Sequence, residues 1–318
     1  MAEWLFEDGI GEDRAILVED GAIVEAAIEL SGLRAGAVVA ARLADIAGIA
    51  TLDDGSEAIV SPLLPGLTEG AAFYAEVIRE AIPERGRPRP AKLRPTDLPL
   101  RPGPSLADRI GSPAPLARHG PNLFEQAGWS ELLNEAATGE IAFEGGALRM
   151  SVTPAMTLFD VDGRLAPGAL AEAGAAAAAK AILRLAITGS IGIDLPTLPR
   201  AGRQAAAAAI DAILPRPFER TAVNGFGFLQ IVRRRTRPSI PETLLADPIG
   251  AAARALLRRA ERASGPLILH AAPRIVARLE AAPDWLAMLE RRVGGAVTLR
   301  PEPGLAISAG HVESRTIQ

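Results

Sequence analysis

The sequence predicts an α/β protein in which a small β-barrel interrupts the chain and a small α/β domain ends it. Three observations support this fold class. Hydrophobic residues make up 48% of the 318 positions, as is typical of globular chains. Short alternating apolar runs cluster in 36–95, and apolar strands alternate with helical patterns in 123–235. A second such pattern begins near residue 249, and the chain is long enough for several cores.

The N-terminal part predicts a hairpin followed by the barrel. Residues 14–20 and 22–30 alternate apolar and polar side chains around Gly21. Five short strand-like runs separated by turns then occupy 36–95, which is typical of an OB-type barrel. A proline-rich connection over 95–117 follows.

The rest of the chain predicts alternating helices and strands. We expect helices at 123–136, 168–187 and 200–213, and strands at 147–153, 156–161, 190–194 and 225–235. In the C-terminal part we expect helices at 251–262, 272–280 and 283–292, and strands at 266–270, 296–300 and 305–309. The expected parts are the segments 1–35 and 96–240 on either side of the barrel (36–95), a linker (241–250) and a small α/β domain (251–318).

Composition restricts the compartment and the available chemistry. The chain has no cysteine, which excludes disulfides and thiolate zinc sites and is consistent with a reducing cytoplasm. The acidic N-terminus does not resemble a secretion signal, and no run of about 18 uncharged apolar residues is present. We therefore expect a cytoplasmic protein that is not embedded in a membrane. The net charge of −4 gives no general reason for a polyanionic partner, although 233–237 is densely basic.

Three aspartates are the candidates for chemistry. Asp160 and Asp162 are two residues apart on one predicted strand, so they point to the same side. Asp194 ends the next apolar strand, and the single helix between them makes the two strands parallel neighbours. We expect the three carboxylates to converge, where a hard cation such as Mg²⁺ relieves their repulsion. Taken singly, each aspartate is more typical of a cap or turn.

A phosphatase is one interpretation of this motif. FDVDGRL resembles the first motif of haloacid-dehalogenase-type phosphatases, in which the first aspartate attacks phosphate. Arg164 stands where that family usually has threonine, well over a hundred residues precede the motif, and no second acidic pair of the expected type follows. The motif alone is a weak signal.

A longer resemblance favours a nuclease. The sequence resembles the ribonuclease E/G family through GEIAFEGGALRMSVTPAMTLFDVDGRL, the alanine-rich helix, GSIGIDLPTL and NGFGFLQIVRRRTRPSI. That family has an RNase H-like domain interrupted by an S1 (OB-type) domain and ends with a small α/β domain. The resemblance therefore implies that 1–35 and 96–240 form one discontinuous RNase H-like catalytic domain around an S1-like barrel at 36–95. The resemblance implies that Asp160 and Asp194 bind Mg²⁺, with Mn²⁺ as an alternative. Asp162 stands where the family has asparagine, and we expect it to be a further metal ligand or to lie just outside the metal's ligands.

The resemblance and the basic residues together give an expected RNA site and an expected activity. The activity is Mg²⁺-dependent endonucleolytic hydrolysis of single-stranded RNA to 5′-phosphate and 3′-hydroxyl products. The expected RNA contacts are Arg85, Arg87, Lys92, Arg94, Arg220, Phe226, Arg233 and Arg235.

The chain also departs from the family pattern. It lacks the CxxC zinc link, so we expect no zinc and, if the protein forms homo-oligomers, no zinc-joined interface. Thr51 and Ile59 stand where the S1 domain usually has aromatic residues, and the Arg-Thr pair that reads a 5′-monophosphate is not found. A non-catalytic RNA-binding or ribosome-associated paralogue is therefore the alternative interpretation.

Overall fold

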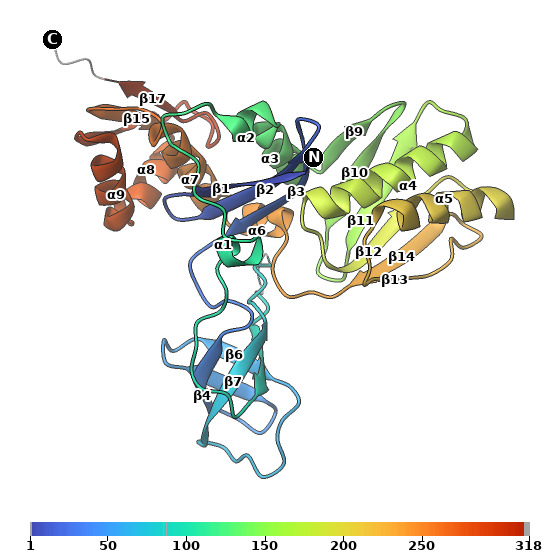
Figure 1. The fold of residues 1–318 in the computed structure, drawn as a ribbon, viewed down its shortest axis with the longest axis horizontal. Helices are drawn as coiled ribbons and strands as arrows, with labels where there is room; N and C mark the ends of the chain where they lie inside the picture. The colour runs from blue at the N-terminus through green and yellow to red at the C-terminus, as the bar shows by residue number, and fades with distance from the viewer. Residues whose placement is uncertain (1, 85, 87, 315–318) are drawn as a thin grey trace.

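Four groups of strands organise the chain into a mixed α/β architecture (Figure 1). The computed structural model describes residues 2–84, 86 and 88–314. The first group is an antiparallel meander of β1 (Glu3–Asp8), β2 (Asp13–Glu19) and β3 (Ala22–Glu29). The predicted hairpin is confirmed, since Asp20 and Gly21 turn the chain with positive φ angles of 51° and 79°. The additional strand β1 lies in the acidic N-terminal segment.

The predicted five-stranded barrel is confirmed. It is closed in the order β4 (Val38–Leu43), β5 (Ile49–Leu52), β6 (Glu57–Val60), β8 (Ala91–Pro95) and β7 (Ala72–Arg79). Strands β6 and β8 are parallel, and the other neighbours are antiparallel. Small and branched side chains fill its interior, among them Ala50, Ala75 and Leu93. The barrel projects from the rest of the molecule (Figure 1).

A six-stranded sheet forms the largest layer. Its order is β13 (Glu219–Arg220), β14 (Phe228–Arg233), β12 (Gly189–Asp194), β11 (Thr157–Gly163), β10 (Gly146–Val152) and β9 (Glu140–Phe143). Only β11 and β12 pair in parallel within it. Helices α4 (Pro167–Arg184) and α5 (Arg200–Ile213) pack against each other and lie on the same side of the sheet (Figure 1).

Close approach of α4 to β11 depends on one small residue. A Cβ atom on Gly174 would lie 2.3 Å from Cγ1 of Val161, so only glycine lets the helix backbone sit this close to the strand. Phe159, Val161 and the alanines of α4 belong to one buried core. Ile16, Ile23 and Ala26 of the N-terminal meander belong to the same core. Segments 1–35 and 96–240 therefore share hydrophobic packing although the barrel separates them in sequence.

The connections contain short helices. They are α1 (Leu106–Arg109), α2 (Leu123–Gln126), α3 (Trp129–Thr138) and α6 (Ile240–Ala246). The single helix expected over 123–136 is two helices, because Gly128 adopts φ +97° between them. The segment expected as a linker, 241–250, is helical in α6 and at the start of α7 (Pro248–Ala260).

The C-terminal unit is a small α/β layer. Helix α7 is followed by β15 (Leu267–Ala271), α8 (Pro273–Glu280), α9 (Pro283–Val293), β16 (Val297–Pro301) and β17 (His311–Ser314), with sheet order β16-β15-β17. The expected strand at 305–309 is wrong, since these residues form turns and irregular backbone and the strand begins at His311. Among the described residues, no helix is both long and apolar enough to cross a membrane.

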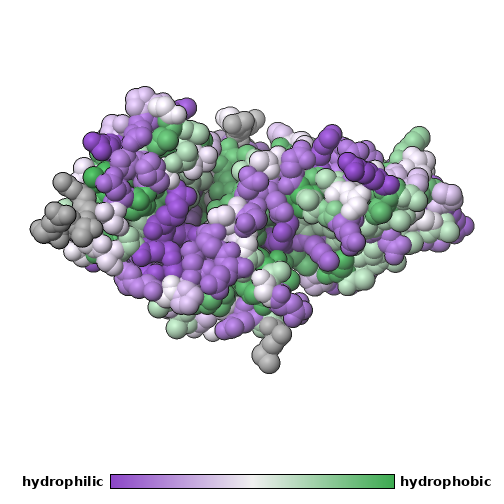
Figure 2. All heavy atoms as spheres, turned by 90° about the horizontal axis from the view of Figure 1, so that it is seen from above, coloured by the Kyte–Doolittle hydropathy of each residue, from purple (hydrophilic) through white to green (hydrophobic). Residues whose placement is uncertain are grey.

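The loop between β1 and β2 joins this unit to the rest of the molecule. Ile10 is buried in the C-terminal core, and its backbone N–H donates to Glu261 Oε1 at 3.1 Å. Arg254 Nε donates to Glu12 at 2.8 Å, and Arg258 Nε donates to Glu7 at 3.0 Å. Seen from the side opposite the barrel, hydrophilic side chains gather where the C-terminal unit meets the body (Figure 2). Ionic contacts therefore surround a small apolar contact at this junction.

Candidate active site

The structure places Asp160 and Asp194 side by side. Strands β11 and β12 pair in parallel, and the register makes Asp160 and Asp194 direct Cα partners. Both residues are exposed. Phe159, Val161 and Ile193 point into the core on the helix side, so alternation places the two aspartates on the opposite, open face. The two residues are therefore neighbours on adjacent parallel strands and face the same way, as predicted.

Apolar groups flank the pair on the same face. A Cβ atom on Gly192 would meet the ring of Phe228 at 2.6 Å and Cδ2 of Leu158 at 2.7 Å. Phe228 is the Cα partner of Asp194 on β14. The two aspartates therefore lie in a row that runs across the sheet and ends at an aromatic ring.

Asp162 has a different environment. It lies two residues further along β11, and its Oδ2 is 3.5 Å from Nη1 of Arg149 on β10. Arg149 is also 3.9 Å from Glu140 and is the Cα partner of Asp160. A single arginine thus sits between two carboxylates beside the aspartate pair. This exposed pairing is worth little in stability, but it places a cation at the edge of the candidate site.

The donor set matches a hard divalent cation. Mg²⁺ in proteins is commonly held by one or two carboxylates, with water and substrate phosphate completing its shell. Asp160 and Asp194 would supply two such oxygen ligands, since both are exposed neighbours on the open face. Among the described residues, no group of three or more His, Cys, Asp or Glu side chains is close enough to hold a metal. The residues present fit a two-carboxylate site, with Mn²⁺ equally compatible in donor chemistry.

An ordered loop borders the end of β12. Asn224 Oδ1 accepts from the backbone N–H groups of Phe226 and Phe228 at 2.9 and 3.1 Å. Gly227 adopts φ +96°, and its missing Cβ would lie 2.1 Å from the carbonyl oxygen of Leu195. Phe226, in contrast, is 85% exposed. The loop therefore holds an unburied aromatic ring next to the strand that ends at Asp194.

Three of the predicted RNA contacts, Arg94, Arg220 and Arg235, are already paired with carboxylates. Arg220 makes a two-pronged contact with Asp211, and this hydrogen bonding raises the pKa of Arg220 and lowers that of Asp211. Arg94 pairs with Glu76 on the barrel surface. Lys92 is the Cα partner of Ile59 on the β6–β8 side of the barrel. Arg85 and Arg87 lie outside the described residues.

The basic segment 233–237 is bound largely to the protein itself. Arg233 donates from Nη1 to the Ile187 carbonyl at 3.0 Å, and burial lowers its pKa. Arg235 pairs with Glu242, and Arg237 Nε is 3.0 Å from Glu80. These arginines connect the end of β14 to neighbouring elements. Their role in RNA binding, like that of the other predicted contacts, stays a prediction.

Sequence reasoning did not identify Arg149 and Asn224. Arg149 is one residue in an alternating strand, and only its antiparallel pairing with β11 brings it to the aspartates. Asn224 had a usable signal, because an asparagine followed by glycine marks a turn in which the side chain often bonds nearby backbone.

Comparisons with known proteins do not add to this description. A scan against protein-family models and a search of curated proteins each found no match for the chain.

Proposed function

We propose that the protein is a metal-dependent endoribonuclease of the ribonuclease E/G type, with its centre at Asp160 and Asp194. The main supporting observation is that these two carboxylates are register partners on adjacent parallel strands and face away from the helices. The sequence resemblance is specific at these same two strands. A five-stranded barrel whose β6 and β8 are parallel is consistent with the S1 (OB-type) domain of that family.

The protein's own groups have separable roles in this proposal. Asp160 and Asp194 would hold Mg²⁺ at the open face, and a bound Mg²⁺ would supply an activated water and stabilise charge on the scissile phosphate. Arg149 would attract the phosphate backbone from the β10 side. Phe226 would stack on a base, which is sequence-tolerant because every base has a π-face.

The barrel is expected to add little base recognition. Thr51 and Ile59 lie on β5 and β6, where partly buried positions alternate with interior ones, and neither is aromatic. Stacking on an aromatic residue contributes about 1–3 kcal/mol per base, which these two positions do not supply. Lys92 beside Ile59 would contact phosphate without reading sequence.

The test is cleavage of an RNA with single-stranded and structured parts, with Mg²⁺ or with EDTA. We expect Asp160→Asn and Asp194→Asn each to abolish Mg²⁺-dependent cleavage while the protein stays folded and RNA binding stays nearly unchanged. Glu144→Gln, an exposed carboxylate in the β9–β10 turn of the same sheet, is the matched control and should cleave normally. Wild-type cleavage by either aspartate variant would end the proposal.

A non-catalytic RNA-binding protein is the second candidate. The observation that favours it is that the described residues contain no group of three or more potential metal ligands, and Arg149 pairs with the third aspartate, Asp162. RNA binding without cleavage at any Mg²⁺ or Mn²⁺ concentration would favour it. The same variant distinguishes a phosphatase from a nuclease. A phosphatase would hydrolyse small phosphomonoesters and not RNA, and Asp160→Asn would remove that hydrolysis.

A further inference from the structure

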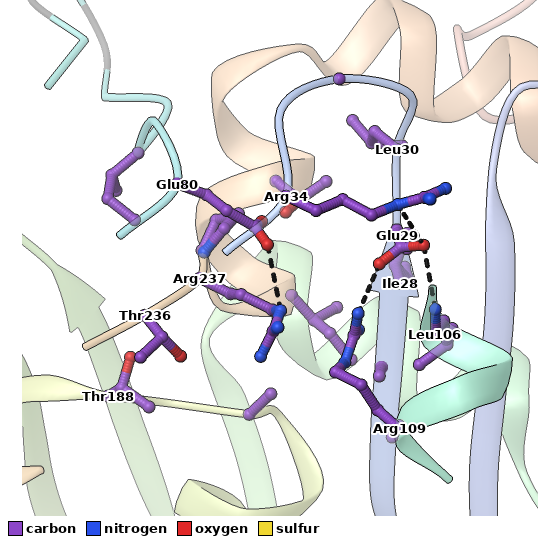
Figure 3. Close-up of a pocket in the computed structure, with 18 of the residues that line it drawn as sticks. Ile28, Glu29, Leu30, Arg34, Glu80, Leu106, Arg109, Thr188, Thr236 and Arg237 are labelled. Carbon is purple, nitrogen blue, oxygen red and sulfur yellow. Dashed lines mark hydrogen bonds and ion pairs between the residues drawn. The ribbon is translucent and has the colours of Figure 1, made fainter. Parts of the chain in front are cut away.

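A cavity of about 580 Å³ lies where the barrel, the N-terminal meander and the six-stranded sheet meet (Figure 3). This volume is within the usual range of small-molecule sites, which often lie between domains. Its wall is mainly apolar and includes Trp4, Leu33, Ile82, Leu106 and Leu183. These residues come from five separate segments, so the cavity is a product of how the units are assembled.

Arginine is the most frequent charged residue in the wall of the cavity. Four arginines and three glutamates line the cavity: Arg34, Arg109, Arg233, Arg237, Glu25, Glu29 and Glu80. Arg34 and Arg109 share Glu29, at 3.0 and 2.6 Å (Figure 3). With every glutamate ionised, the lining keeps one excess positive charge. Burial raises the pKa of Glu25 and Glu80, which increases this excess whenever either carboxyl is protonated.

Several donors in the wall lack a well-aligned partner. The Oγ1 atom of Thr188 is buried and has no hydrogen-bond partner among the described residues. Nε of Arg34 and Nε of Arg237 are buried and within 3.0 Å of a carboxylate, but neither makes an aligned hydrogen bond. These three atoms have almost no accessible surface, so a ligand would instead meet the rest of the guanidinium groups of Arg34 and Arg237, whose side chains are 34% and 30% exposed.

We propose that this cavity binds a small phosphate monoester with a planar apolar body. Guanidinium groups match phosphate oxygens in geometry as well as charge, and Arg34 and Arg237 supply the donors. The apolar wall beside Trp4 and Ile82 would receive the body of the ligand. The inference is independent of the proposed nuclease activity.

The position of the cavity gives binding a structural consequence. The backbone N–H of Glu80, at the end of β7, donates to the Thr236 carbonyl at 2.9 Å and so connects the barrel to the segment after β14. Both residues line the cavity. A bound phosphate monoester would therefore contact the barrel and the six-stranded sheet at once and hold their relative orientation.

The test is calorimetric titration of the full chain with phenyl phosphate, inorganic phosphate and phenol. We expect phenyl phosphate to bind one site more tightly than either of its two parts. Arg34→Gln and Arg237→Gln should each weaken its binding about tenfold, whereas Arg274→Gln, an exposed arginine on α8, should not. The unfolding midpoint of each variant is measured alongside, which separates lost binding from lost folding.

Three outcomes would overturn the inference. The first is no saturable binding of phenyl phosphate, and the second is equal affinity for inorganic phosphate, which would exclude an apolar subsite. The third is unchanged affinity in both cavity variants. A further titration compares two forms of one short oligoribonucleotide, one with a 5′-phosphate and one with a 5′-hydroxyl, as ligands of the protein. Equal affinity would assign the site to a free small molecule, whereas preference for the 5′-phosphate form would reject that assignment.

Discussion

Asp162 and Asp160 are two residues apart and yet have different surroundings. Arg149 lies 3.5 Å from Asp162, while Asp160 is the register partner of Asp194. We therefore expect Asp162→Asn to leave the Mg²⁺ concentration for half-maximal cleavage within about twofold of the wild-type value. A metal titration of the cleavage rate measures this. An increase of about tenfold, equivalent to about 1.4 kcal/mol, would instead make Asp162 a direct ligand.

His270 predicts a pH-dependent contribution to stability. Its Nδ1 is 2.5 Å from Glu302, its Nε2 is 2.9 Å from Glu313, and its ring stacks on His311. Hydrogen bonding to Glu302, and then to Glu313, raises the pKa of His270 above its ordinary value. A raised folded-state pKa stabilises the fold fully below the unfolded pKa of about 6.5, and the gain is lost as pH rises through the folded value.

The corresponding experiment compares His270→Gln with the wild type. The loss in free energy of unfolding caused by the substitution should be larger at pH 6 than at pH 9, as measured by chemical denaturation at both values. His119→Gln is the control, because His119 is exposed and far from this cluster in sequence. An equal loss for His270→Gln at both pH values would show that protonation does not contribute.

At the scale of elements, local patterns predicted strands better than connections. The strands of the barrel were predicted, and so were β11 and β12 of the six-stranded sheet. In each case the sequence shows an apolar run with turn residues at its ends. Helix α6 occupies the segment expected as a linker, because proline is favoured in the first turn of a helix, where Pro241 lies, and Ser239 caps this helix. The strand expected at 305–309 failed because its apolar residues occupy turns.

The candidate site could be predicted only where it depends on one βαβ connection. The parallel pairing of β11 with β12 follows from a single intervening helix, so Asp160 and Asp194 were placed correctly. The position of Arg149 beside the aspartates depends on the register of the antiparallel pair β10 and β11. A one-residue slip in this register would move its side chain to the other face. The partners of Arg233 and Arg235, Ile187 and Glu242, belong to other elements and no local pattern reveals them.

The contact between α4 and β11 supports an element-scale prediction. Gly174→Ala places a Cβ 2.3 Å from Val161 and should lower the free energy of unfolding by about 1–3 kcal/mol, because overpacking forces the helix away from the strand. Gly168→Ala in the same helix is the control, since a Cβ there meets nothing within 4 Å. It should be neutral or stabilising by at most about 1 kcal/mol. Equal effects in urea denaturation would exclude the packing explanation.

At the scale of the whole molecule, ionic contacts hold residues 95–118 against the N-terminal meander. Arg109 Nη1 donates to Glu29 at 2.6 Å, and Arg118 Nη2 donates to Asp8 at 2.6 Å. Arg101 bonds through its backbone to Val38 of the barrel. The three arginines of this stretch thus have contacts at three different places. No common pocket for a terminal phosphate is formed by them.

We therefore expect cleavage that does not depend on the 5′ end of the RNA. Discrimination of a doubly charged 5′-monophosphate from a triphosphate or hydroxyl requires several charge-assisted hydrogen bonds converging on one group. Recognition should rest instead on internal phosphates, so activity should fall steeply with added salt. The measurement uses one RNA with 5′-monophosphate, 5′-triphosphate or 5′-hydroxyl ends, or circularised, at fixed salt. A rate more than about tenfold higher for the monophosphate, or about 1.4 kcal/mol of discrimination, would show that arginines outside this stretch form a sensor.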